Sequence, residues 1–224
     1  MRNFYFIDMS GKQLINNASA VLFDFDGLVM DSEWPIYESW LRVFQAEGHD
    51  LPVETYVQCI GSGFHVWSPE TYLEELTGKS FDWDAVNAHR QTEIERDLTQ
   101  ADALPGAHDL FIRLNEEGKK VAVVSSSSHR WVDRWLEQLD LIQYTQEVVC
   151  RGDAPEIKPA PDLYLEAVKR FGVPAEQCVV LEDSLNGIKA GIAAGCQTIA
   201  IPSRLTSVLD FSIADQVVSS LTEL

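Results

Sequence analysis

The stretch from residue 21 to residue 32 constrains the fold of this chain more than any other. It reads VLFDFDGLVMDS, an apolar run followed by two carboxylates two positions apart and then a glycine. An apolar run of this length that ends at a glycine is typical of a buried strand. Gly27 allows the chain to turn there, so the side chains of Asp24 and Asp26 can meet in one pocket. The alternative is a solvated polar turn after a strand.

Two carboxylates this close repel each other unless a cation lies between them. The pair therefore predicts a bound divalent metal, with one carboxylate acting as a nucleophile and the other exchanging a proton. The sequence shows no Cys or His pair with the spacing of a zinc site. Carboxylate oxygens instead suit Mg²⁺.

Three later segments also place polar side chains where a strand or a bend ends. They are residues 121–128 (VAVVSSSS), 157–162 (IKPAPD) and 179–184 (VVLEDS). In an open α/β sheet, ligands bind beyond the carboxyl ends of the strands. We therefore expect the serine hydroxyls, Lys158, Glu182 and Asp183 to meet Asp24 at one edge. Taken singly, each segment has a plainer interpretation: a polar turn, a solvated lysine or a helix N-terminus.

Strands and helices alternate along most of the chain after residue 105. The predicted helices are 107–117, 129–138, 161–171 and 185–194, and the predicted strands are 119–124, 146–150, 177–182 and 197–201. Such alternation predicts an α/β fold with a doubly wound, mostly parallel sheet, a Rossmann-like core. Residues 1–19 precede the first motif strand, as an edge strand or an ordered arm.

The interval from Asp24 to Ser125 is far longer than one crossover helix requires. We therefore expect residues 34–100 to form an inserted all-helical cap domain, with residues 1–33 and 101–224 as the catalytic core. Tyr37, Trp40, Leu41 and Phe44 recur at helical spacing. Ser68, Pro69 and Gly78 stand where a helix would start and stop, and residues 85–98 read as a further helix.

Composition limits the partners of the chain. The 224 residues carry 17 basic and 35 acidic side chains, a net charge of −18. Nucleic acids and anionic membranes are poor partners for such a chain, since phosphate contacts need clustered Lys and Arg. Four scattered cysteines, with no apolar run of membrane length and no signal peptide, favour a cytoplasmic protein. We also expect a monomer.

The four motifs in order are DFDG…DSE, VAVVSSSS, IKPAPDLY and LEDSLNGIKAG. This order resembles the haloacid dehalogenase superfamily of phosphotransferases, and within it the β-phosphoglucomutase-like phosphatases, over about residues 20 to 205. The resemblance implies a Mg²⁺-dependent phosphatase that forms an aspartyl-phosphate intermediate. Its substrate would be a small phosphorylated metabolite, a phosphomonoester of the sugar or polyol class.

The resemblance also implies roles for individual residues. Asp24 would be the nucleophile, and Asp26 would protonate the leaving alcohol and then activate water, which requires a proton on Asp26. Ser125 and Lys158 would hold the phosphoryl oxygens. The metal ligands would be Asp24, the backbone carbonyl of Asp26, Asp183 and, in direct or indirect support, Glu182. Independently of the resemblance, backbone N–H groups of Phe25, Asp26 and the loop near Ser126 are candidate phosphate donors.

Departures from the family pattern favour a phosphatase over a phosphohexomutase, which stays as the alternative. Mutases carry a histidine twelve residues after the nucleophile, where this chain has Ile36. They also carry a lysine shortly after the serine motif, where this chain has Ser128 and then His129. A third possibility, from a different class, is a catalytically silent protein that binds a metabolite.

The expected cap domain would exclude water and choose the leaving group. Residues 31–34 and 101–105 are the predicted hinges, and residues 61–67, rich in glycine and aromatics, are the predicted selectivity loop. His65 in that loop is either a ligand for a sugar hydroxyl or a surface histidine. The plain alternative for the loop is an interhelical turn.

Overall fold

The computed structural model describes residues 10–60 and 67–224. Within them, six parallel strands form one sheet in the order β3-β2-β1-β4-β5-β6. The strands are β1 (Ala20–Phe23), β2 (Lys120–Val124), β3 (Glu147–Val149), β4 (Cys178–Glu182), β5 (Gln197–Ala200) and β6 (Gln216–Val217). The predicted doubly wound α/β fold is thereby confirmed, with β1 in the middle of the sheet.

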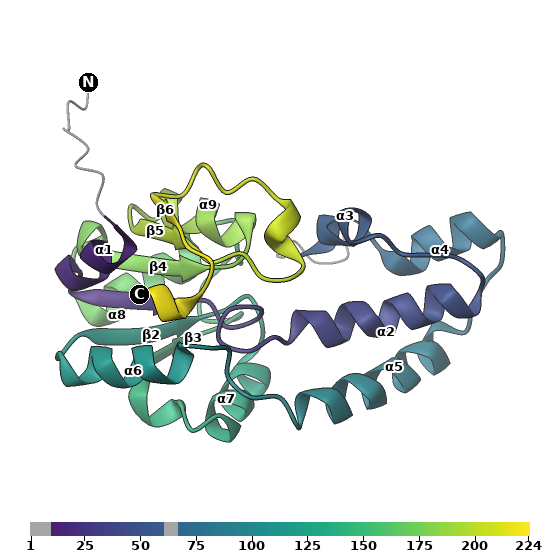
Figure 1. Cartoon of the computed structure of the whole chain (residues 1–224), viewed down its shortest axis with the longest axis horizontal. Coiled ribbons are helices and arrows are strands. Elements are labelled where there is room, and N and C mark those ends of the chain that lie inside the picture. The colour runs from purple at the N-terminus through teal and green to yellow at the C-terminus, as the bar shows by residue number, and fades with distance from the viewer. Residues whose placement is uncertain (1–9, 61–66) are drawn as a thin grey trace.

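Helices cover both faces of this sheet (Figure 1). Val21 and Phe23 of β1 face one layer, while Ala20 and Leu22 face the other, as the two-residue period of a strand requires. The first layer holds α1 (Gly11–Asn17), α6 (Ala107–Glu116) and α7 (His129–Gln138). The second layer holds α8 (Asp162–Phe171) and α9 (Leu185–Ala193). Both faces are covered by helices, so most strand residues are buried and apolar, with polar residues such as Lys120 and Gln197 at strand starts.

The described part of the interval between β1 and α6 consists of helices joined by turns and loops, with isolated bridges that involve Met30. It contains α2 (Glu33–Ala46), α3 (Val53–Tyr56), a 3₁₀ turn η1 (Val57–Cys59), α4 (Pro69–Thr77) and α5 (Trp83–Leu98). These helices extend from one end of the sheet, with α2 and α5 side by side (Figure 1). Trp40, Phe44, Tyr56 and Leu73 are buried in their shared core. We refer to residues 33–98 as the helical region.

The two connections between the helical region and the sheet run side by side. Met30 and Ala103 form an antiparallel bridge. The N–H of Leu104 donates to the carbonyl of Val29 at 2.8 Å. The helical region therefore leaves and rejoins the sheet at one place, near the end of β1.

Helix boundaries follow local signals in the sequence. The Ser68 hydroxyl accepts from the N–H of Thr71 at the start of α4, and Gly78 ends the helix at a φ of +66°. Such a left-handed residue is the usual end of a helix, and it favours glycine. The remaining short 3₁₀ turns are η2 (Ile142–Tyr144), η3 (Ala175–Gln177), η4 (Thr206–Val208) and η5 (Leu221–Glu223).

Outside the helical region, α1 and β6 are the helix and the strand that the sequence-based prediction lacked. Residues 11–17 form α1, so the expectation of an edge strand is wrong for them; Ser10 and Gln13 cap this helix reciprocally. The edge strand β6 is two residues long, too short to show a period. The predicted selectivity loop, His65 included, lies outside the described residues except for Trp67.

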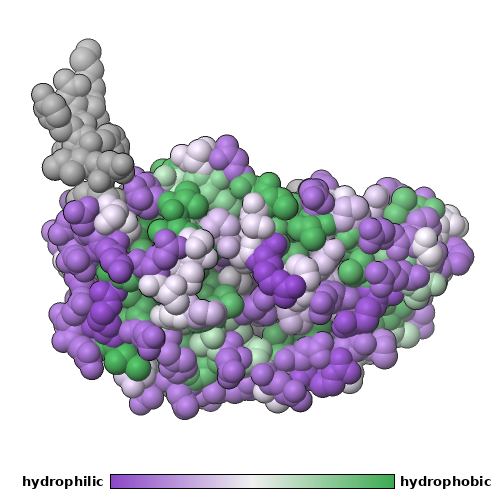
Figure 2. All heavy atoms as spheres, in the orientation of Figure 1, coloured by the Kyte–Doolittle hydropathy of each residue, from purple (hydrophilic) through white to green (hydrophobic). Residues whose placement is uncertain are grey.

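The surface is predominantly hydrophilic, with hydrophobic residues scattered over both the sheet and the helical region on the face shown in Figure 2. Among the described helices, none has the length and apolar character needed to cross a bilayer.

Candidate active site

Three strands bring the predicted site residues to one edge of the sheet. Asp24 follows β1, Ser125 follows β2 and Asp183 follows β4. Because β1 lies between β2 and β4, these side chains come from neighbouring strand ends, where open α/β sheets bind their ligands. A cavity of about 690 Å³ opens there, lined by these residues and by side chains of the helical region.

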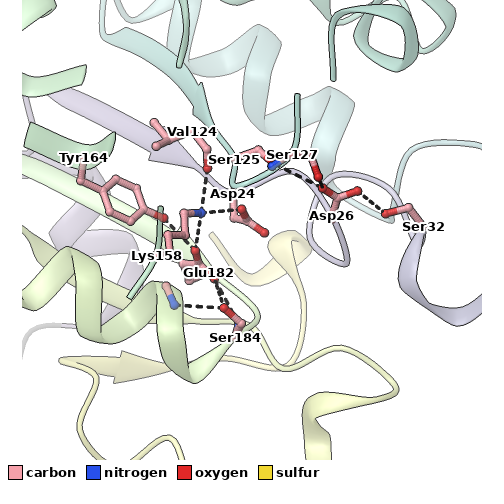
Figure 3. A network of polar contacts seen from close by, with 11 residues as sticks. Asp24, Asp26, Ser32, Val124, Ser125, Ser127, Lys158, Tyr164, Glu182 and Ser184 are labelled. Atoms are coloured by element: carbon pink, nitrogen blue, oxygen red, sulfur yellow. Dashed lines mark hydrogen bonds and ion pairs between the residues drawn. The ribbon is translucent and has the colours of Figure 1, made fainter. Parts of the chain in front are cut away.

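Lys158 lies at the centre of a buried polar network (Figure 3). Its Nζ donates to Asp24 Oδ1 at 2.5 Å, to Glu182 Oε1 at 2.6 Å and to the Val124 carbonyl at 2.7 Å. The Tyr164 hydroxyl donates to the same Glu182 oxygen at 2.8 Å. Burial lowers the pKa of Lys158, but Asp24 and Glu182 outweigh it and raise the pKa, so this ammonium stays charged.

The carboxylates of Asp24, Glu182 and Asp183 form a tight cluster, with one oxygen of each within 4.8 Å of the others. Burial and then the charge of Glu182 raise the pKa of Asp24 to about 8, although Lys158 opposes the shift. Burial and the charge of Asp24 raise the pKa of Asp183 well above its usual range. In the described part of the chain, the network sets three buried carboxylates against one ammonium group.

The carboxylates of Glu182 and Asp183 differ in the hydrogen bonds that their oxygens accept. Both oxygens of Glu182 accept hydrogen bonds, Oε2 from the N–H and hydroxyl of Ser184. Asp183 Oδ2 is buried and accepts none among the described residues. A buried oxygen without a donor is costly and points to a missing partner. The cluster offers oxygen ligands alone, which suits a hard divalent cation.

Two glycines allow these carboxylates to approach the backbone. Gly27 has a φ of +80°, and a Cβ at this position would lie 2.3 Å from Asp183 Oδ2. A Cβ on Gly187 would lie 1.7 Å from Glu182 Oε1. Both contacts are far shorter than a carbon and an oxygen tolerate. Gly27 of the DFDG motif therefore makes room for Asp183, and Gly187, the first glycine of LNGIKAG, makes room for Glu182.

Asp26 lines the same cavity, but its carboxylate turns away from Lys158 (Figure 3). Its Oδ1 accepts from Ser32 Oγ at 2.6 Å and from Trp131 Nε1 at 2.8 Å. Its Oδ2 accepts from Ser127 Oγ at 2.7 Å and from Ser125 Oγ at 3.3 Å. Four donors therefore surround its two oxygens. The expectation that Asp26 carries a proton stays a prediction.

Successive serines after β2 point in different directions. Ser125 and Ser127 reach Asp26, whereas the Ser126 hydroxyl lines the cavity and is buried without a partner among the described residues. Phe25 is fully buried in the hydrophobic core, so its backbone alone is left for the expected phosphate contact. The roles predicted for these residues stay predictions.

Sequence analysis missed five residues that hydrogen-bond the carboxylates of the site: Ser32, Ser127, Trp131, Tyr164 and Ser184. The alternation of an extended chain would have paired Ser127 with Ser125. Trp131 lies on α7 just after the serine motif, and Tyr164 is the last residue of the motif IKPAPDLY, on α8. No sequence pattern shows which carboxylate their polar tips reach.

The helical region supplies the opposite wall of the cavity. Ile36, Trp40, Asn87 and Arg90 are among its lining residues. Ile36 occupies the position at which the mutases carry a histidine, and it presents a hydrocarbon side chain to the cavity. Trp40 is almost fully buried, while Trp34, Trp67 and Trp83 pack partly buried around the same core.

The fold and site together are a doubly wound sheet with an acidic cluster and a lysine at its carboxyl edge. The profile of the haloacid dehalogenase-like hydrolases matches residues 21–201. The chain therefore belongs to the haloacid dehalogenase-like hydrolase family, as the motif order predicted, and it is an enzyme of that family.

Known relatives extend over nearly the whole chain. The Bacillus subtilis protein YhcW, a phosphatase by name, is 33% identical, with 92% of this chain and 93% of the relative covered. Hexitol phosphatase B of Escherichia coli is 29% identical, with coverage of 92% and 93%.

Solved structures agree with this assignment. A hydrolase of the same family from Deinococcus radiodurans, with bound phosphate and sodium, superposes with a TM-score of 0.75 at 28% identity and coverage of 92% and 93%. A Thermotoga maritima protein named as a β-phosphoglucomutase has a TM-score of 0.73, with coverage of 92% and 95%. At 24% identity the latter likeness shows the fold alone.

Proposed function

We propose that the chain is a Mg²⁺-dependent phosphatase that hydrolyses a small phosphomonoester of the sugar or polyol class through an aspartyl-phosphate intermediate. The observation that carries the proposal is the buried cluster in which Asp24 contacts Lys158 beside Glu182 and Asp183. The relatives named as phosphatases support it, among them hexitol phosphatase B.

In the first half of the reaction, a carboxylate oxygen of Asp24 attacks phosphorus and the bond to the leaving alcohol breaks. Asp26 gives its proton to that alcohol, which leaves an acyl phosphate on Asp24. In the second half, Asp26 takes a proton from water as the water attacks phosphorus, and Asp24 is regenerated. Lys158 and the Ser125 hydroxyl hold the phosphoryl oxygens, on which negative charge accumulates. Backbone N–H groups at Phe25, Asp26 and Ser126 add neutral donors.

Asp24, Asp183 and the backbone carbonyl of Asp26 would hold Mg²⁺. The partnerless Asp183 oxygen and the excess of carboxylates over ammonium groups support this ligand set. When bound, the ion supplies positive charge that offsets the repulsion between Asp24 and the phosphoryl group. Glu182, whose oxygens are both engaged, holds Lys158 in place and supports the cluster indirectly.

Residues 34–100 would act as the cap domain over a core made of residues 1–33 and 101–224. Two observations support this division: both parts line one cavity, and the two connections between them are paired. A cap that closes on the sheet edge would exclude water from the acyl phosphate and contact the leaving group.

The test is phosphate release from a panel of small phosphomonoesters, with Mg²⁺ and with EDTA. Asp24→Asn should lower kcat by at least about 10⁴-fold, because an amide cannot replace the attacking carboxylate. Asp109→Asn, at an exposed position on α6, is the matched control and should keep full activity. An Asp24→Asn protein that keeps a tenth of the activity would contradict the mechanism.

The alternative functions give different results in the same assay. A phosphohexomutase would convert one sugar phosphate into another with little free phosphate. A catalytically silent protein would bind a phosphorylated metabolite without turnover. The hydrocarbon side chain of Ile36 in the cavity wall argues against the mutase, which needs a titratable group there.

A further inference from the structure

The cavity has a second buried cation, at the end remote from Lys158. Arg90 projects from α5 into the cavity wall and is 7% exposed. Its guanidinium carbon lies 3.3 Å from the centre of the Trp40 ring on α2, the helix beside α5 in Figure 1. Stacking on the indole fixes the plane of the guanidinium group and leaves its edge for hydrogen bonds.

This guanidinium is poorly satisfied for a group so deeply buried. Its Nη1 donates to Asn87 Oδ1 at 2.6 Å, and its Nε is buried without an acceptor. Among residues 10–60 and 67–224, no carboxylate lies within ion-pairing distance of it. Buried charges in proteins are normally paired, because an unpaired one loses its hydration without compensation.

Glu70 and Glu93, the two acids that act electrostatically on Arg90, form hydrogen bonds with other residues. Glu70 accepts from Asn87 Nδ2 at 2.8 Å, and Glu93 accepts from Arg42 Nε at 3.2 Å. Burial lowers the pKa of Arg90 to about 10, with Tyr56 and Glu70 opposing the shift. The group is still charged at neutral pH, so its positive charge is available to a ligand in the cavity.

We propose that Arg90 binds a second anionic group, a carboxylate or a phosphate, at the end of the substrate opposite to the phosphoryl group that is transferred. The inference rests on the proposed phosphatase function and narrows its substrate class. One cavity joins Lys158 and Asp24 to Arg90, and its volume of about 690 Å³ suits a small metabolite. A chain with a net charge of −18 needs such a local cation at each end of a doubly anionic substrate.

The test measures binding separately from turnover. Three ligands with the same six-carbon chain are titrated by calorimetry, with Mg²⁺, against Asp24→Asn protein, which holds them without consuming them. They are glucitol 6-phosphate, 6-phosphogluconate and glucitol 1,6-bisphosphate. We expect at least one of the two anionic-tailed ligands to bind about 10-fold or more tightly than glucitol 6-phosphate. The tighter of the two shows whether the group is a carboxylate or a phosphate.

Adding Arg90→Gln should remove most of that preference, so that the ligands bind within about 2-fold of each other, and Arg90→Lys should reduce it less because the charge remains. Arg96→Gln is the matched control: Arg96 lies on the same helix, is exposed and pairs with Asp97, so the preference should not change. The ratio of two affinities on one protein is unaffected by partial misfolding, which lowers the active fraction for both ligands.

A preference that is the same with Gln at position 90, or tighter binding of glucitol 6-phosphate than of both anionic-tailed ligands, would overturn the inference. Failure of the proposed function is a distinct result. In that case the wild-type protein would release no phosphate from any ester. The ratio of affinities for anionic-tailed and neutral-tailed ligands, measured with and without Arg90→Gln, would still test the role of Arg90.

Discussion

The two ends of the cavity each bury a cation, but they satisfy it in opposite ways. At the sheet edge, Lys158 contacts two carboxylates and a backbone carbonyl. In the helical region, Arg90 lies on an aromatic ring with one amide partner and, within the described part of the chain, no carboxylate. The first arrangement stabilises the folded protein and fixes a geometry, whereas the second leaves binding capacity unused.

The difference follows from the elements that carry the two cations. Asp24 and Glu182 are anchored by strands paired on both sides, so neither can move without breaking the sheet. Arg90 and Trp40 lie on two helices whose shared core is aromatic and held by packing. Rigid strand ends hold the catalytic groups in a fixed geometry. Substitutions on a helix surface can adapt the cavity to another leaving group without disturbing the sheet.

Replacing each cation separately tests this comparison most strongly. Lys158→Met leaves two buried carboxylates without a counter-ion and should lower the free energy of unfolding by about 4 kcal/mol. Arg90→Met loses a stacked cation but also removes an unpaired buried charge, so we expect a change below about 1 kcal/mol. Urea denaturation without added metal measures both.

Lys169→Met is the control for Lys158→Met. Lys169 is exposed and pairs with Glu166 one helical turn away, and such a pair is worth under about 1 kcal/mol. Equal losses for the variants at positions 158 and 90 would mean that the two ends of the cavity do not differ in the way described.

Gly187→Ala tests how closely Glu182 packs at the sheet end. In an ordinary helix interior, Ala would stabilise by about 1 kcal/mol relative to Gly. Here a Cβ would overlap Glu182, so we expect instead a loss of about 2 kcal/mol in the free energy of unfolding. Lys189→Ala, exposed on the same helix, should stay within about 0.5 kcal/mol of wild type. A more stable Gly187→Ala protein would refute the packing argument.

The smallest expected effect lies at the rim of the core, where His129 bridges Asp133 and Asp153 at 3.3 and 2.8 Å. Partial burial lowers the pKa of His129, but these two hydrogen-bonded carboxylates outweigh it and raise the pKa above 6.5. The pair should therefore stabilise the fold in full below pH 6.5, with the contribution lost as the pH rises through the raised pKa.

Thermal unfolding at about pH 5.5 and about pH 8.5 compares wild type with His129→Gln. The variant should lose about 0.5 kcal/mol at the lower pH and nothing at the higher pH, since His129 and Asp133 are each almost half exposed. A larger loss at the higher pH would mean that the neutral imidazole, rather than the charged one, holds the loop at Asp153.

Much of the fold could be predicted because each core element has a local signal. The predicted boundaries of β2, α7 and β4 differ from the structure by one residue or less. Strand ends marked by polar residues also predicted that Asp24, Lys158, Glu182 and Asp183 would meet. By contrast, the sequences of α1 and β6 show only a weak hydrophobic period. The position of α1 depends on packing against the last residues of the chain, and that of β6 on pairing with β5.

The sequence by itself determined the order of strands and helices, the haloacid dehalogenase family, and the presence of four charged groups at one sheet edge. These depend on local patterns and on a motif order that survives divergence. The tertiary structure alone decided that Trp131 holds Asp26. It also decided that, among residues 10–60 and 67–224, Asp183 keeps an oxygen without a donor and Arg90 lacks a carboxylate. Each of these is a relation between side chains distant in the chain, and a hydrogen bond forms or fails within a few tenths of an ångström, which no sequence spacing specifies.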